Sequence, residues 1–139
     1  MIRSSKEKGW RLIHEASRIL NRDLKLAFEQ SDTSLTIRRA QEVVELSIKG
    51  ALQILGVDYP KSHDVGKLLS QVAKEKQCPL EEKILQRFAR VSESLAEMRG
   101  PSFYGEEDYS IDQARDAFEE ARFVLETIEK HFKGSVAQG

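Results

Sequence analysis

Apolar residues recur every three or four positions through most of this chain, the spacing that places side chains on one face of an α-helix. The clearest stripe comprises Ile111, Ala114, Phe118, Ala121, Leu125, Ile128 and Phe132. No stretch alternates apolar and polar residues as a half-buried β-strand does. The pattern therefore predicts an all-α fold, an antiparallel up-and-down bundle of four long helices plus one short helix, in a single domain over residues 1–139.

Turn and capping residues divide the chain into five predicted helices. These are expected over residues 6–30, 35–55, 63–73 and 79–98, with the last helix starting at 111. Gly56 is placed to end the second helix in the left-handed conformation, and Ser62 can cap the short third helix. Pro79 suits the first position of the fourth helix.

The segment between the fourth and fifth helices carries the strongest breaking signal. Gly100-Pro101 is expected to end the fourth helix, because proline disfavours the helical conformation in the residue before it. Ser110 and Gln113 form the pattern of a capping box for the fifth helix. We therefore expect a loop from about Arg99 to Ser110.

Composition narrows the function classes. The net charge is −1, with a balance of +4 over residues 1–40 and −6 over residues 93–139, so the chain is no strongly basic nucleic-acid binder and no DNA partner is expected. A single cysteine, Cys78, cannot form an internal disulfide and favours a reducing, cytoplasmic setting. No run of about 18 apolar residues predicts a membrane span, and the first residues lack the apolar core of a secretion signal.

Motifs for several common chemistries are missing. The three histidines show no metal-ligand spacing with each other, with cysteine or with clustered carboxylates. The sequence also lacks a glycine-rich phosphate loop and a nucleophile elbow. We therefore expect no metal site and no cofactor, and set aside P-loop nucleotide hydrolysis, serine hydrolysis and zinc catalysis.

The expected loop after the fourth helix holds the first candidate site. Arg99, Phe103, Tyr104 and Tyr109 lie within eleven residues of each other. An arginine beside aromatic rings can bind a phosphate and stack a base. In the alternative, purely structural interpretation, Phe103 and Tyr109 fasten the loop to the bundle while Arg99 caps the fourth helix.

A second candidate surface runs along the second helix. Arg38, Glu42, Glu45 and Lys49 are spaced to form one polar line beside the apolar stripe, and Glu45 and Lys49 form a favourable i,i+4 pair. The line predicts either a solvated, salt-bridged face or one wall of a polar groove.

Two segments together resemble the HEPN family, the higher eukaryotes and prokaryotes nucleotide-binding domain. The first is RRAQEVVELSIKGALQILGVDYPKSHDVGKLL, residues 38–69, and the second combines the Arg99–Tyr104 region with YSIDQARDAFEEARFVLETI. The resemblance implies a five-helix homodimer that often works beside a minimal nucleotidyltransferase as a toxin–antitoxin pair. Catalytic members are metal-independent ribonucleases that carry an arginine, four to six residues and then a histidine.

This sequence departs from that catalytic pattern. Four residues separate Arg99 from Tyr104, which stands where a catalytic member carries histidine. A tyrosine hydroxyl, with an ordinary pKa near 10, is a poor base at neutral pH but can donate a hydrogen bond to a phosphate. The departure favours binding over cleavage, although His63 can supply an imidazole from another part of the chain.

Three hypotheses follow from the sequence. The first is a HEPN-type protein that binds nucleotide or RNA through Arg99, Phe103 and Tyr104, with Arg38, Glu42 and Lys49 as a second wall, and that acts with a nucleotidyltransferase. The second is a metal-independent endoribonuclease that uses Arg99 with Tyr104 or His63. The third is a helical adaptor without catalysis, whose first helix has two apolar faces for oligomerisation.

Overall fold

The computed structural model describes residues 4–137, with side chains for residues 4–133, and that part of the chain is helical without a strand. Its elements in order are α1 (Ser5–Ile19), the π-helical segment η1 (Leu20–Leu24), α2 (Lys25–Glu29), α3 (Thr33–Ile54), α4 (Gly66–Val72), α5 (Glu82–Tyr104) and α6 (Ile111–Ala137).

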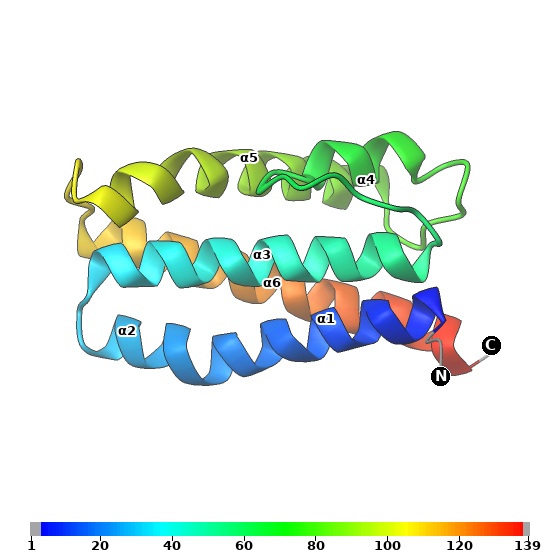
Figure 1. Ribbon diagram of the computed structural model, residues 1–139, viewed down its shortest axis with the longest axis horizontal. Coiled ribbons are helices and arrows are strands. Elements are labelled where there is room, and N and C mark those ends of the chain that lie inside the picture. Colours follow the sequence, from blue (N-terminus) through cyan, green and yellow to red (C-terminus); the bar gives the residue numbers. More distant parts are fainter. Residues whose placement is uncertain (1–3, 138–139) are drawn as a thin grey trace.

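The helices form the predicted antiparallel bundle. Segments α1, η1 and α2 follow one another without a break and make the first long helical arm, and α3, α5 and α6 make the other three (Figure 1). The short helix α4 packs against α5 at one end of the bundle (Figure 1). The all-α prediction of four long helices and one short helix is confirmed.

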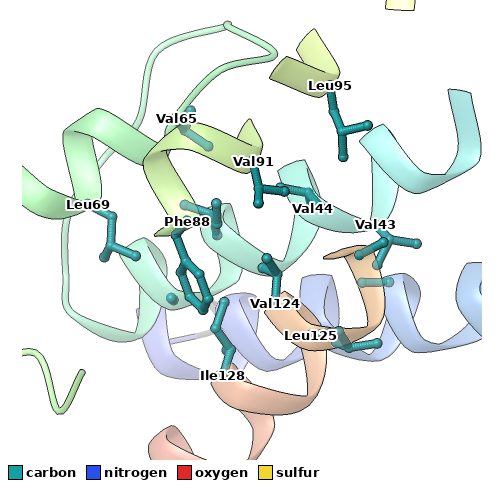
Figure 2. Close-up of a cluster of buried hydrophobic side chains, with 14 of the residues drawn as sticks. Val43, Val44, Val65, Leu69, Phe88, Val91, Leu95, Val124, Leu125 and Ile128 are labelled. Atoms are coloured by element: carbon teal, nitrogen blue, oxygen red, sulfur yellow. The ribbon is translucent and has the colours of Figure 1, made fainter. Parts of the chain in front are cut away.

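Helix α3 lies at the centre of the bundle and packs against α1, α5 and α6. Its side chains meet those of α5 and α6 in the core, as Figure 2 shows for Val43, Val44, Phe88, Val91, Val124, Leu125 and Ile128. Burial of these side chains is the main source of stability for such helices. Within the described residues no helix combines the length and apolar character needed to cross a membrane.

Two glycines allow α1 and α3 to approach closely. A Cβ atom added at Gly9 would stand 2.5 Å from the backbone oxygen of Gly50, and one added at Gly50 would stand 2.6 Å from the Ile13 side chain. Real Cβ atoms do not tolerate such distances, so the crossing requires glycine at both positions. This contact fixes the first arm against the central helix.

Two predicted helix boundaries are confirmed, whereas α3 begins at Thr33, two residues before its predicted start. Asp32 caps α3, because its carboxylate accepts from the Leu35 backbone N–H at 3.1 Å. Gly56, with a φ of 79°, ends the same helix in the left-handed conformation. Ser110 and Gln113 form the capping box of α6, with reciprocal bonds of 2.8 and 3.1 Å between each side chain and the other's backbone N–H.

The prediction that Gly100-Pro101 ends the fourth helix is wrong. Helix α5 continues through Pro101 to Tyr104, and Gly105 ends it with a φ of 68°. The last turn is held from outside the helix, since the Ser102 hydroxyl donates to the Ser34 backbone carbonyl at 2.6 Å. Arg99, Phe103 and Tyr104 therefore lie on a helix and not on the expected loop.

Two other boundaries differ from the prediction. The short helix begins at Gly66 and not at 63, because the Ser62 hydroxyl accepts from the Asp64 backbone N–H in a local turn and does not cap a helix. The fourth helix begins at Glu82, three residues after Pro79. The intervening Leu80 is buried in the core, and this sets the path of the chain before the helix starts.

Two glycines near the end of α5 give a matched test of this helix end. Apart from adjacent parts of the chain, neither Gly100 nor Gly105 has an atom within 4 Å of an added Cβ, but only Gly105 has a positive φ. Gly105→Ala is expected to lower the free energy of unfolding by about 1–2 kcal/mol, because alanine is strained in the left-handed conformation. Gly100→Ala is expected to change it by less than about 0.5 kcal/mol, because the helix propensity gained at this helical position is offset by the contact between an alanine Cβ and the ring of the following Pro101. Urea denaturation measures both, and equal effects from the two substitutions would contradict this helix end.

Candidate functional site

Arg99 reaches from α5 to the central helix α3. Its Nη1 atom donates to the side-chain oxygen Oε1 of Gln41 at 2.7 Å and lies 3.9 Å from Oε1 of Glu42. This contact differs from the structural interpretation, in which Arg99 caps its own helix. Its contact with Gln41 joins the two candidate surfaces that the sequence analysis treated separately.

Gln41 is the centre of a hydrogen-bonded group that we call the Gln41–Glu45 network. Its amide Nε2 donates to Oε1 of Glu45 at 2.9 Å and to the backbone carbonyl of His63 at 3.2 Å. Glu45 also accepts from Lys49 Nζ at 2.7 Å and lies 2.8 Å from His63 Nδ1. The network thus comprises Gln41, Glu45, Lys49, His63 and Arg99, and it brings His63 and Arg99 to opposite ends of one amide.

Glu45 is held in its charged form by this network. Burial by itself would raise the pKa of the carboxyl group, but hydrogen bonds from Gln41, Lys49 and His63 outweigh it and leave the pKa below its ordinary value. The expected ion pair between Glu45 and Lys49 is thereby present, in a partly buried setting and not on a solvated face.

Aromatic side chains lie exposed at the end of α5. Phe103 is 59% exposed and Tyr104 is 73% exposed, and their rings meet edge to face with centroids 5.1 Å apart. The guanidinium carbon of Arg38, on α3, lies 5.4 Å from the centre of the Phe103 ring. We call Arg38, Phe103 and Tyr104 the aromatic end; it offers two exposed rings with a partly buried arginine beside them.

Tyr109 behaves differently from these two aromatic residues. Its ring is buried, and its hydroxyl donates to the Met98 backbone carbonyl at 3.3 Å. Tyr109 therefore fastens the turn after α5 to the bundle, as the structural interpretation expected. Phe103, which that interpretation gave the same role, is exposed and does not do so.

The predicted polar line on α3 divides into parts with different surroundings. Eleven positions separate Arg38 from Lys49, which corresponds to roughly 16 Å along a helix. Lys49 is paired with Glu45, and its Nζ atom lies 5.1 Å from the centre of the Tyr59 ring. Glu42 accepts from Arg39 and lies near Arg99, so it balances two cations. Of the predicted line, Arg38 lies at the aromatic end, and Arg99 contacts the line at Gln41.

A separate groove between α5 and α6 has a volume of about 460 Å³. Its lining includes Arg87, whose guanidinium donates twice to Glu120 and lies 3.6 Å from the centre of the Phe123 ring. The lining contains no aromatic ring on which a base could stack, and it includes the carboxylates of Asp116 and Glu120. The groove is therefore less suited to a nucleotide than the aromatic end.

Metal binding has no evident place in the described part of the chain. Residues 4–137 contain no group of three or more histidine, cysteine, aspartate or glutamate side chains arranged to hold an ion.

Gln41 was not among the site residues predicted from the sequence, although it lies three residues after Arg38 and four before Glu45 on the same polar line. That position was the available signal, because a polar residue inside such a line shares its surroundings.

The lowered pKa of Glu45 predicts a pH-dependent contribution to stability. A carboxyl group whose pKa is lower in the folded than in the unfolded state stabilises the fold at neutral pH and loses this effect as the pH falls. Glu45→Gln should therefore reduce the free energy of unfolding most at pH 7, and the difference from wild type should shrink below about pH 4.5.

Chemical denaturation across this pH range measures the difference. Glu119→Gln is the control, because it removes an exposed carboxylate that pairs with Arg122 outside the network. A difference between Glu45→Gln and wild type that stays constant with pH would contradict the lowered pKa.

Comparison with known proteins identifies the family to which the chain belongs. The family model described as the HEPN domain matches residues 10–131, nearly the whole chain. Neither a curated protein nor a solved structure gives a significant match. The matched region includes both segments on which the sequence resemblance rested, together with the Gln41–Glu45 network and the aromatic end. The chain therefore belongs to the HEPN domain family.

Proposed function

We propose that this protein binds a nucleotide or single-stranded RNA at the aromatic end and Arg99. The observation that carries the proposal is the exposure of Phe103 and Tyr104 beside two arginines on neighbouring helices. Adjoining exposed apolar side chains, such as these two rings in edge-to-face contact, mark an interaction surface more often than single exposed ones do. Membership of a family of nucleotide- and RNA-related helical domains supports the same conclusion.

Each part of this surface matches one part of a nucleotide. A base can stack on Phe103 or Tyr104, which contributes about 1–3 kcal/mol per base in single-stranded nucleic-acid binding. Arg99 has five N–H donors, and one of those on Nη1 donates to Gln41. The others are available to phosphate oxygens. The Tyr104 hydroxyl adds a neutral donor. Binding at this surface requires no metal or cofactor, because arginine supplies the charge that balances the phosphate.

A metal-independent endoribonuclease is the second candidate, and the pairing of Glu45 with His63 favours it. A carboxylate at His63 Nδ1 holds a proton on that atom and leaves Nε2 free to accept one. The imidazole can then take the proton of a ribose 2′-OH, while Arg99 stabilises the charge on the phosphate. The half-exposed His63 side chain is open to a ligand. This chemistry would replace the histidine that is missing at position 104.

A single assay with labelled single-stranded RNA in EDTA distinguishes these candidates. Binding should weaken about tenfold in Arg99→Ala, Arg38→Ala and Phe103→Ala, because each removes one phosphate or stacking contact. Arg115→Ala is the matched control; this exposed arginine pairs with Asp112 on α6, and its loss should leave binding unchanged. Unaltered binding in all three variants would overturn the proposed site.

The same gel reports cleavage. Intact RNA in the wild-type lane supports binding without catalysis. RNA that is cut by the wild type, cut by Tyr104→Phe and left intact by His63→Ala would establish the second candidate. Cutting that survives His63→Ala but not Tyr104→Phe would assign the role of the base to Tyr104.

We further propose that the protein is a cytoplasmic homodimer that acts with a minimal nucleotidyltransferase in a toxin–antitoxin-like pair. This part of the proposal rests on the family, whose members often have this arrangement. Sedimentation of the purified protein is expected to give twice the chain mass of 15.9 kDa, and affinity purification should recover a small nucleotidyltransferase. A monomer that recovers no such enzyme would contradict it.

A further inference from the structure

Gln41 is a buried polar residue to which the binding chemistry proposed above assigns no contact with a ligand. It lies on α3 and is only 1% exposed, yet its amide group makes three hydrogen bonds. A buried amide without partners would destabilise the fold, so satisfied bonds alone can explain its presence. The bonds also link separate parts of the protein, because they join α3 to α5 and to the segment before α4.

The partners of Gln41 leave one orientation for its amide group. The Glu45 carboxylate and the His63 backbone carbonyl can only accept, so both require the Nε2 side. The oxygen Oε1 is then directed to Arg99, which can only donate. Glutamate at this position could not donate to Glu45, and an apolar side chain could serve neither partner. Glutamine can thus accept a hydrogen bond from an arginine through Oε1 while its Nε2 donates one to a carboxylate.

The far side of the network is itself fixed. Glu45 is anchored by Lys49 Nζ and His63 Nδ1, at 2.7 and 2.8 Å, and the ammonium group of Lys49 lies over the Tyr59 ring. Gln41 therefore rests on a charged group with several partners of its own. Its bond to Arg99 is charge-assisted, the kind that contributes most to geometry and strength.

We propose that Gln41 is a positioning residue for Arg99. It fixes one guanidinium nitrogen, Nη1, and so presents the remaining N–H donors to a phosphate next to the aromatic end. The inference rests on the proposed function, since it gives Arg99 the role of phosphate contact. Glu45 and the His63 carbonyl act behind Gln41 by setting the orientation of its amide group.

A double-mutant cycle on RNA binding tests this inference. Gln41→Met keeps the length of the side chain and removes both halves of the amide, and it should weaken RNA binding about tenfold in the wild-type background. In the Arg99→Ala background the same change should have less than about a twofold effect, because the group that Gln41 positions is already gone. Equal weakening in both backgrounds would overturn the proposal.

Ser47→Ala is the matched control for lost buried polarity on α3. The Ser47 hydroxyl is buried and, among the residues that the structure describes, bonds only to the Val43 carbonyl of its own helix, so its removal should leave RNA binding unchanged. Thermal unfolding of Gln41→Met and Ser47→Ala checks that each remains folded at the temperature of the assay. Weakened binding in folded Ser47→Ala would show that general loosening of α3 accounts for the effect, and would also overturn the proposal.

A measurement without RNA separates this inference from the proposed function. NMR of the Arg99 guanidinium group should show slow rotation about the Cζ–Nη bonds in the wild type and fast rotation in Gln41→Met. Slow rotation in a wild type that fails to bind RNA contradicts the proposed function and leaves the positioning of Arg99 by Gln41 supported. Fast rotation in the wild type contradicts the positioning whatever the binding result.

Discussion

The burial of helix α3 among three other helices is the constraint on which the rest of this structure depends. A helix so placed has little solvent for its polar side chains, and most of them find a partner inside the protein, although the buried Nε atoms of Arg38 and Arg39 have none among the described residues. Thr36 and Ser47 find such partners by bonding to backbone carbonyls within four residues. Gln41 and Glu45 find them by reaching Arg99 of α5 and His63 of the segment before α4. The polar network is thus a direct consequence of the central position of the helix.

This arrangement gives the candidate site a rigid base and an open edge. Arg99 is anchored to the network on one side, while Phe103 and Tyr104 follow on the next turn of the same helix and remain exposed. The close crossing of α1 and α3 at Gly9 and Gly50 supports the base from the opposite side of the bundle. A phosphate and a base would therefore meet groups whose spacing is set by the core and not by a loop, which lowers the entropy lost on binding.

The sequence predicted the helical bundle well because its apolar spacing, its capping box at Ser110 and Gln113, and its left-handed Gly56 all act locally. The prediction failed at Pro101. A proline inside a helix costs about 3 kcal/mol, but contacts with residues distant in the sequence outweigh this cost here. The bond from Ser102 to Ser34 and the burial of Tyr109 are contacts of that kind. Arg99, His63 and Glu45 were each singled out from the sequence, but Gln41 was not. The contact between Gln41 and Arg99 spans 58 positions and has no local signature.

The proposed function requires that a nucleotide phosphate and base bind at the end of α3 and α5 that carries Arg38, Arg99 and the exposed rings. Titration of the ¹⁵N-labelled protein with AMP and with a short oligouridylate, followed by backbone amide NMR, can locate the bound ligand. We expect saturable shifts concentrated in residues 36–42 and 99–105, with smaller changes near 63. Shifts confined to the groove between α5 and α6, around residues 87–94 and 113–120, or no shifts at all, would contradict it.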